Sequence, residues 1–375
     1  MLNQLPYELG ADGPEMANGV VTIPLPGQPL GNEASPQDGH QASVALEFFA
    51  GPENGLVEPA VLGVLGRQPT PYNPLVLHGP SGTGKSHLVR GMAATWKLNF
   101  PHSRVVYTTA VDFAREMADA FEAQSVEEFR AKYRGAKLVI FEDVGELATK
   151  PAAQEELICT LDAIVQRGGQ VLATLAAAPQ EIGGFMPALQ SRLAAGLCVP
   201  LVSPGPDTRR AILQRWSALR EFELADSILA LLAEGLNGTV PELLGAMLQL
   251  EVPAREEGRA IDARQIREFL SRRDAALRPK LRDVAVLTAR YFSLRLSDLR
   301  GSSRKRPVVV ARDVAMYLCR RFARESLGRI GDYFGGRDHT TVLHACRKTE
   351  ERMEADPAIR QAIDRLQRRF PAVGR

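Results

Sequence analysis

A glycine-rich octapeptide constrains the fold of this chain more than any other feature. Residues 79–86 read GPSGTGKS, which fits the pattern G-x-x-x-x-G-K-[ST]. An apolar strand, Leu75–Leu77, is predicted directly before it, and an amphipathic helix, Lys85–Trp96, directly after it. In that context successive backbone N–H groups turn inward to form an anion site, and the helix N-terminus adds its positive end. The sequence therefore predicts a strand–loop–helix unit that binds the phosphates of a nucleotide.

We expect ATP or ADP and Mg²⁺ as the cofactors of this loop. Lys85 can reach the β- and γ-phosphates, and the Ser86 hydroxyl is a natural Mg²⁺ ligand. The candidate nucleotide-binding residues are Gly79, Pro80, Ser81, Gly82, Thr83, Gly84, Lys85, Ser86 and His87.

A second part of such a site is an acidic residue at the end of a buried strand. Leu138–Phe141 is apolar throughout and is followed by Glu142 and Asp143. One carboxylate can hold the metal through water and the other can orient the attacking water, so Ser86, Glu142 and Asp143 form the candidate metal site. A strand that simply ends in solvated charges is the structural alternative. Because Glu142 and Asp143 follow the phosphate loop in the same domain, we favour their interpretation as a metal site.

The pattern of elements divides the chain into an α/β part and an all-helical part. Short apolar runs alternate with amphipathic stretches from Ala45 to Pro204, which predicts a mostly parallel sheet with helices on both faces. The pattern after the sequence SPGPD is purely helical. We expect a disordered N-terminal tail with a short strand at Val20–Ile23, a nucleotide-binding domain, a helical lid and a DNA-binding domain, at 1–43, 44–204, 205–275 and 276–375.

Charge is distributed very unevenly along the chain. Residues 276–375 carry 23 basic and 11 acidic side chains, whereas the first 275 residues carry 23 basic and 33 acidic ones. The net charge of +2 therefore conceals a basic nucleic-acid module joined to an acidic body. The sequence lacks an apolar run of the roughly 20 residues that would span a bilayer, and we expect no signal peptide, because the first residues show no basic patch followed by an apolar core. Four widely spaced cysteines agree with a cytoplasmic protein.

Residues 331–346 read GDYFGGRDHTTVLHAC and predict a helix-turn-helix. Gly335 and Gly336 permit a tight turn between two helices, and the second helix presents its first turn to the major groove. The carboxylate of Asp338 can accept from a cytosine amine, or it can serve as a helix N-cap, or do both. The candidate base-reading residues are Arg337, Asp338, His339, Thr340 and Thr341.

A basic loop lies upstream of the helix-turn-helix. Residues 301–307 read GSSRKRP, a composition typical of loops that track phosphates or place an arginine in a narrow minor groove. An ordinary solvated charge run is the alternative. The candidate DNA contacts in this region are Arg304, Lys305, Arg306, Arg312 and Arg320.

The stretch GGRDHTTVLHACRK closely resembles the signature of the bacterial chromosomal replication initiator DnaA family, and the resemblance extends from about Val44 to Phe370. It implies an AAA+ nucleotide-binding core, a helical lid and a C-terminal domain that recognises DnaA-box sites in double-stranded DNA. It also implies an ATP-dependent homo-oligomer at an origin. Thr174 matches the sensor-1 position and joins Lys85, Glu142 and Asp143 as a candidate catalytic residue, and the family's usual N-terminal domain is expected to be missing.

Several positions depart from the family pattern. Glu142 stands where the family usually has Asp, Ala188 occupies the place of the arginine finger, and Pro241 occupies that of the sensor-2 arginine. Arg192 matches a second arginine of the finger motif and is a candidate inter-subunit residue. Loss of one arginine finger costs about 10³-fold or more in hydrolysis where it has been measured. At most a slow ATPase is therefore expected.

Two functions fit these features. The first is an initiator, or a divergent paralogue, that binds ATP or ADP and assembles on DnaA boxes. The second is a sequence-specific regulator of transcription or replication with little ATP hydrolysis, acting at promoters or initiator sites. Leu281–Phe292 is amphipathic, which leaves contact with acidic phospholipid open beside the simpler interpretation of packing.

Overall fold

A computed structural model of the chain describes residues 16–17, 19–25, 47–66, 72–258, 261–367 and 369–370. Contacts divide it into two compact units, Met1–Ile261 and Asp262–Arg375.

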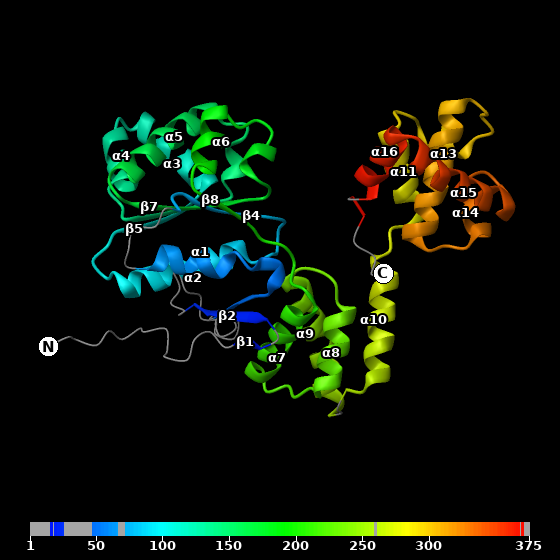
Figure 1. Cartoon of the computed structure of the whole chain (residues 1–375), viewed down its shortest axis with the longest axis horizontal. Helices are drawn as coiled ribbons and strands as arrows, with labels where there is room; N and C mark the ends of the chain where they lie inside the picture. The colour runs from blue at the N-terminus through cyan, green and yellow to red at the C-terminus, as the bar shows by residue number, and fades with distance from the viewer. Residues whose placement is uncertain are drawn as a thin grey trace. The chain divides into compact units, whose positions relative to one another are not determined.

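The N-terminal unit is built on a five-stranded parallel sheet with strand order β5-β6-β7-β4-β8 (Figure 1). Strands β6 and β7 are buried along their whole length because helices cover both faces. Residues Leu75–His78 of β4 pair with Leu172–Leu175 of β7 on one side and with Leu197–Pro200 of β8 on the other. The strands are β4 (Leu75–His78), β5 (Val105–Thr109), β6 (Leu138–Glu142), β7 (Gln170–Leu175) and β8 (Leu197–Pro200).

Helices cover both faces of this sheet (Figure 1). Leu88, Val89 and Met92 of α2 are fully buried, whereas Phe113, Tyr133 and Phe141 form an aromatic cluster on the opposite face. The helices are α1 (Val57–Leu65) and α2 (Lys85–Asn99) on the first face, and α3 (Ala110–Glu122), α4 (Val126–Arg134), α5 (Pro151–Gln166) and α6 (Pro187–Ala194) on the second.

A small antiparallel sheet brings the N-terminal segment onto this unit. Strands β1 (Met16–Ala17), β2 (Val20–Pro24) and β3 (Glu47–Ala50) pair in that order. The strand expected at Val20–Ile23 is thus present as β2, which extends to Pro24, whereas β1 at Met16–Ala17 lies in a part of the tail where no strand was expected. Val20, Ile23 and Leu25 bury enough apolar surface to hold the segment, and Leu25 packs beside Gly91 of α2. The remainder of 1–43 lies outside the described residues.

Three helices complete the N-terminal unit and form the predicted lid. They are α7 (Pro206–Leu219), α8 (Asp226–Gly235) and α9 (Val240–Glu257). Glu53, in the turn before α1, accepts hydrogen bonds from Gly205 N at 2.8 Å and from Thr208 Oγ1 at 2.7 Å, at the point where the chain enters α7. Burial opposes ionisation of Glu53, but these donors hold its pKa below the usual range. The carboxylate therefore connects the core to the beginning of the lid.

The C-terminal unit is helical throughout its described residues. Its core contains Ile330, Phe334 and Val342, and a short π-helix, η5 (Cys319–Ala323), directly follows the helix that ends at Leu318. The helices are α10 (Ala263–Leu277), α11 (Leu281–Tyr291), α12 (Leu296–Arg300), α13 (Arg306–Leu318), α14 (Leu327–Tyr333), α15 (His339–Ala355) and α16 (Pro357–Gln367). In the part of the chain that the structure describes, no helix is both long and apolar enough to cross a membrane.

The expected fold class is confirmed: a parallel α/β sheet with helical additions precedes an all-α helix-turn-helix unit. Contacts group α10 with the C-terminal helices, whereas the sequence pattern placed 262–275 at the end of the lid.

Candidate nucleotide and DNA sites

The phosphate loop lies between β4 and α2, as its sequence predicts, and its lysine is bound within the loop. Lys85 Nζ donates to Gly79 O at 2.6 Å and to Pro80 O at 2.8 Å, and the residue is only 8% exposed. Burial lowers the Lys85 pKa, and the nearby carboxylates of Asp143 and Glu142 oppose that shift. A bound nucleotide would therefore replace two loop carbonyls as the partner of this ammonium.

Two distant segments close around the loop. The Phe48 ring of β3 lies so near Gly84 that a β-carbon there would approach it to 2.9 Å, and Gly84 has a φ of 96°. From the lid, Thr239 lies against Gly82, and Val240 N donates to Gly82 O at 3.4 Å. The N-terminus of α9 thus contacts the phosphate loop directly, with Pro241 exposed in its first turn.

The other loop side chains divide into bound and accessible ones. Thr83 is buried and its hydroxyl donates to Pro80 O at 3.0 Å, whereas Ser81 is exposed and Ser86 is half-buried. A ring nitrogen of His87 lies 3.0 Å from Glu47 O, so this side chain holds β3 in place.

The strand-end carboxylates lie at the end of β6, as the sequence predicts. The Glu142 side chain is 5% exposed, and its Oε1 has no hydrogen-bond partner. Asp143 is exposed, with a φ of 51°, and its backbone N–H donates to the buried Thr174 hydroxyl at 2.9 Å. Thr174 therefore fixes the turn that carries Asp143.

The residues present fit a Mg²⁺ ion. A carboxylate oxygen that is buried without a hydrogen-bond donor costs free energy of folding unless a ligand binds it. Glu142 Oε1 is such an oxygen. Among the described residues no group of three or more His, Cys, Asp or Glu side chains can hold a metal alone. Mg²⁺ usually takes one or two carboxylates together with substrate phosphates, and Glu142 and Asp143 could supply the carboxylates.

The candidate inter-subunit arginine already has a partner within its own chain. Arg192 Nε lies 3.2 Å from Asp162 Oδ1 of α5, and its side chain is 43% exposed. Ala188, at the predicted finger position, is exposed on the same helix, α6.

In the C-terminal unit the predicted turn and recognition helix are present. Gly335 and Gly336 have φ values of 94° and 72°, and α15 begins at His339. Asp338 caps this helix: its Oδ1 accepts from Thr341 N and from the Thr340 hydroxyl, each at 2.7 Å. The Thr340 hydrogen bond, with the backbone bond from Thr341, lowers the Asp338 pKa to about 2. His339, Thr340 and Thr341 are exposed, so the first turn of α15 presents its side chains to solvent.

Arg312 was expected to contact DNA, but its side chain lies inside the C-terminal unit and the residue is 5% exposed. Its guanidinium donates to four carbonyl oxygens that surround the basic loop, those of Leu299 at 2.6 Å and of Asp298, Gly301 and Ser303 at 2.9 Å each. A guanidinium that uses its donors in this way holds the loop and is not available to a DNA phosphate. Helical periodicity placed Arg312 on α13 but did not show that its side chain folds back.

Arg337 joins the same loop to the recognition helix. Its Nη2 donates to Gly301 O at 2.8 Å, and the residue is half-buried. The remaining candidates lie on the surface: Arg304 and Lys305 in the loop, and Arg306 at the start of α13. Arg320, in η5, is exposed and donates to Glu325 O at 2.9 Å.

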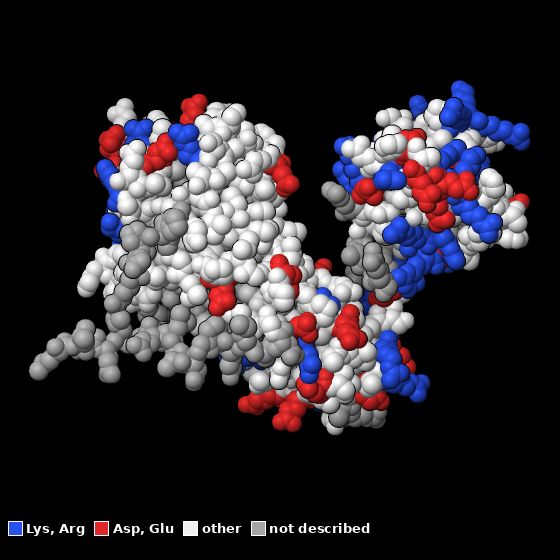
Figure 2. Space-filling view, viewed as in Figure 1, with Lys and Arg blue, Asp and Glu red and all other residues white. Residues whose placement is uncertain are grey.

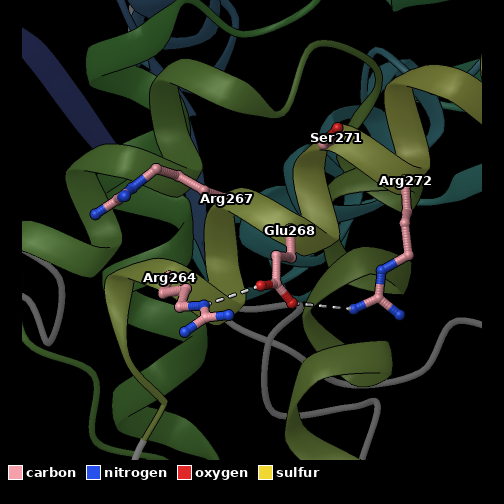
Figure 3. A pocket seen from close by; sticks show the side chains of 5 residues that line it. All are labelled: Arg264, Arg267, Glu268, Ser271 and Arg272. Carbon is pink, nitrogen blue, oxygen red and sulfur yellow. Dashed lines mark hydrogen bonds and ion pairs between the residues drawn. The ribbon is translucent and has the colours of Figure 1, made fainter.

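The uneven charge of the sequence is visible on the molecular surface. Figure 2 shows Lys and Arg gathered over the C-terminal unit, interrupted by an acidic group, while the N-terminal unit shows larger uncharged areas in the same view. A shallow depression on α10 is lined by Arg264, Arg267, Glu268, Ser271 and Arg272. Glu268 lies between Arg264 at 3.1 Å and Arg272 at 3.9 Å, which neutralises part of its charge (Figure 3).

Sequence reasoning missed the residues that act through long-range contacts. Phe48, Glu53 and Thr239 are distant in sequence from the elements that they hold, and no local pattern marks them. Residues 51–54, just before α1, show the same kind of long-range contact. Asn54 is buried and exchanges two hydrogen bonds with the backbone of Val202.

Comparisons with known proteins identify the family. Residues 42–200 match the bacterial DnaA ATPase domain and residues 281–349 match the bacterial DnaA helix-turn-helix. The chromosomal replication initiator protein DnaA of Geobacter sp. strain M21 is 32% identical over 328 residues, which cover 86% of this chain and 71% of the relative. This chain belongs to the DnaA family. DnaA of Levilactobacillus brevis is 33% identical over 325 residues, which cover 85% of this chain and 71% of that relative.

Solved DnaA structures resemble the chain as well. Domain III of the Thermotoga maritima DnaA replication initiation protein is 30% identical, covers 60% of this chain and 93% of its own, and has a TM-score of 0.54. AMPPCP-bound DnaA from Aquifex aeolicus is 26% identical, covers 85% of this chain and 96% of its own, and has a TM-score of 0.54. Another DnaA structure contains AMPPCP and single-stranded DNA.

Proposed function

We propose that this chain binds ATP or ADP with Mg²⁺ in its N-terminal unit and recognises DnaA-box sites in double-stranded DNA with its C-terminal unit. In this way it would initiate or regulate chromosomal replication. The exposed first turn of α15, capped by Asp338 and joined through Arg337 to the basic loop, is the observation that carries the proposal.

The nucleotide part of the proposal rests on the loop between β4 and α2. Lys85 would exchange Gly79 O and Pro80 O for phosphate oxygens, and the backbone N–H groups of the loop would bind the remaining phosphate charge. Ser86, Glu142 and Asp143 would hold Mg²⁺, which neutralises phosphate charge when it is bound.

Hydrolysis is expected to be slow or absent. The finger position is Ala188, the lid contacts the phosphate loop at Thr239 and Val240, and Pro241 brings no arginine to it. Single-turnover hydrolysis of prebound, radiolabelled ATP tests this expectation. We expect most ATP to remain intact over many minutes, whereas turnover comparable to that of an AAA+ ATPase with both arginines would contradict it.

The DNA part assigns base contacts to α15 and phosphate contacts to the surrounding cations. Asp338, His339, Thr340 and Thr341 would read the major groove, with Arg337 at its edge. Arg304 would enter the minor groove, and Lys305, Arg306 and Arg320 would contact phosphates.

The initiator is favoured over the regulator because the matching relatives are named as replication initiators. Footprinting on clustered boxes, with and without ATP, distinguishes the two. Cooperative, ATP-dependent filling with permanganate-reactive melting supports the initiator, which would assemble as a homo-oligomer with Arg192 at the subunit contact. Non-cooperative filling of the clustered boxes that ATP does not change, with no melting, supports the regulator. A cytoplasmic location and contact with acidic phospholipid remain predictions.

A further inference from the structure

An arginine on the helix after the phosphate loop reaches the buried carboxylate of the candidate metal site. Arg90 lies on α2, five residues after Lys85, and its side chain is 62% exposed. Its Nη2 lies 3.5 Å from Glu142 Oε2, at the end of β6. The DNA and nucleotide contacts proposed above do not use this arginine.

A tyrosine fixes the position of that guanidinium. Arg90 Nε donates to Tyr107 Oη at 2.8 Å, and Tyr107 lies on β5, opposite Ile140 of β6. Burial raises the pKa of Tyr107, so its hydroxyl stays neutral at all ordinary pH values. The hydrogen bond to Tyr107 raises the Arg90 pKa, which keeps the guanidinium charged.

The two oxygens of Glu142 consequently have different surroundings. Oε2 faces the Arg90 guanidinium, whereas Oε1 is buried without a hydrogen-bond partner. The other cation beside this carboxylate, Lys85, is bound to Gly79 O and Pro80 O. Arg90 therefore compensates part of the buried charge of Glu142 and, together with the Tyr107 hydroxyl, holds its orientation.

We propose that Arg90 is a positioning residue that partly neutralises Glu142 and thereby relaxes the Mg²⁺ requirement of nucleotide binding. A fixed positive charge beside a metal-binding carboxylate disfavours a divalent cation there. The same charge compensates nucleotide phosphates when no metal is bound. The inference rests on the proposed nucleotide binding. It concerns how far the Arg90 charge replaces Mg²⁺ as the cation beside the Glu142 carboxylate.

Binding of a fluorescent ATP analogue to the full chain, measured in EDTA and across a Mg²⁺ titration, tests the proposal. The readout is the ratio of the Kd in EDTA to the Kd at saturating Mg²⁺. We expect Arg90→Gln to raise this ratio at least about five-fold, because the analogue binds more weakly in EDTA and Mg²⁺ binds more tightly. Arg90→Lys keeps the charge but loses the Nε donor to Tyr107, so it should raise the ratio by a smaller factor than Arg90→Gln. Lys97→Gln, an exposed change on the same helix, is the matched control and should not move the ratio.

A double-mutant cycle separates this role from simple stabilisation of the fold. In a Glu142→Gln background, Arg90→Gln should change the ratio by a smaller factor than in the wild-type background, since only its effect on the nucleotide phosphates is left. Tyr107→Phe, which frees Arg90, should raise the ratio by a smaller factor in the wild-type background. An unchanged ratio in Arg90→Gln, or an equal shift in Arg90→Lys, would overturn the inference. Failure of the wild-type chain to bind the analogue in either condition would instead overturn the proposed nucleotide binding.

Discussion

The phosphate loop and the first turn of α15 are both short glycine-flanked motifs, yet their side chains are in opposite states. In the loop, Lys85 is buried and bound to its own chain, and the lid contacts Gly82. In the recognition turn, His339 and Thr341 are exposed, and the Asp338 cap already fixes the backbone. The DNA surface is thus formed in advance, whereas the nucleotide site must exchange internal hydrogen bonds for phosphate contacts.

Removal of the loop lysine should have the largest effect of any single change. Lys85→Ala deletes the charged donor that phosphates would take over, so we expect nucleotide affinity to fall on the order of 100-fold. Isothermal titration with ATP measures the loss. DNA binding to a single box should stay the same if the two regions are as independent as their side chains suggest, and a parallel loss of DNA binding would break the comparison.

Arg312 and Arg304 provide a matched pair within the DNA-binding unit. Arg312→Ala leaves four carbonyls without their donor, and we expect it to cost about 3 kcal/mol of stability and to loosen the basic loop. Arg304→Ala removes an exposed side chain and should change stability by less than about 0.5 kcal/mol, while it weakens DNA binding. Chemical denaturation of both variants checks this. Equal stability of the two would show that Arg312 is not a structural clamp.

Specificity and general affinity should be separable on the DNA surface. His339→Ala or Thr341→Ala is expected to relax base preference by about 1–3 kcal/mol at one position. Arg320→Ala should weaken binding to all sequences alike and flatten the salt dependence. Competition binding with single-base variants of the box provides the comparison. If His339→Ala or Thr341→Ala reduced specific and non-specific affinity in the same ratio, the placement of α15 in the groove would be wrong.

The smallest effect concerns the carboxylate that connects core and lid. The pKa of Glu53 lies below its ordinary value of 4.5, so its contribution to stability is present above that value and disappears as the pH falls through the lowered pKa. Glu53→Gln should therefore cost about 1 kcal/mol or less at pH 7, and the difference from wild type should shrink below pH 4. Thermal unfolding at several pH values measures this trend, and a difference that grew toward low pH would contradict it.

Local patterns in the sequence predicted most of the architecture and both motifs. The phosphate loop, the strand before it and the glycine turn before α15 depend on residues that are adjacent in sequence, and all three are confirmed. Helix α1 and helix α6 were missed, because their short apolar patterns lie between stronger neighbours.

Contacts between distant segments were beyond the reach of those patterns. Arg312 occupies a position on α13 from which a long cation can extend into solvent or fold back onto carbonyls, and only the tertiary fold decides between these. The pairing of β2 with β3 joins segments that more than twenty residues separate, so no local periodicity marks it.

Fluorescence anisotropy with a single-box duplex and a scrambled duplex, at one salt concentration, with and without ATP, tests the central claim most directly. The account predicts that the box binds on the order of 10³-fold more tightly than the scrambled sequence, with the same Kd in both nucleotide conditions. Equal affinity for the two duplexes, or single-box binding that requires ATP, would contradict it.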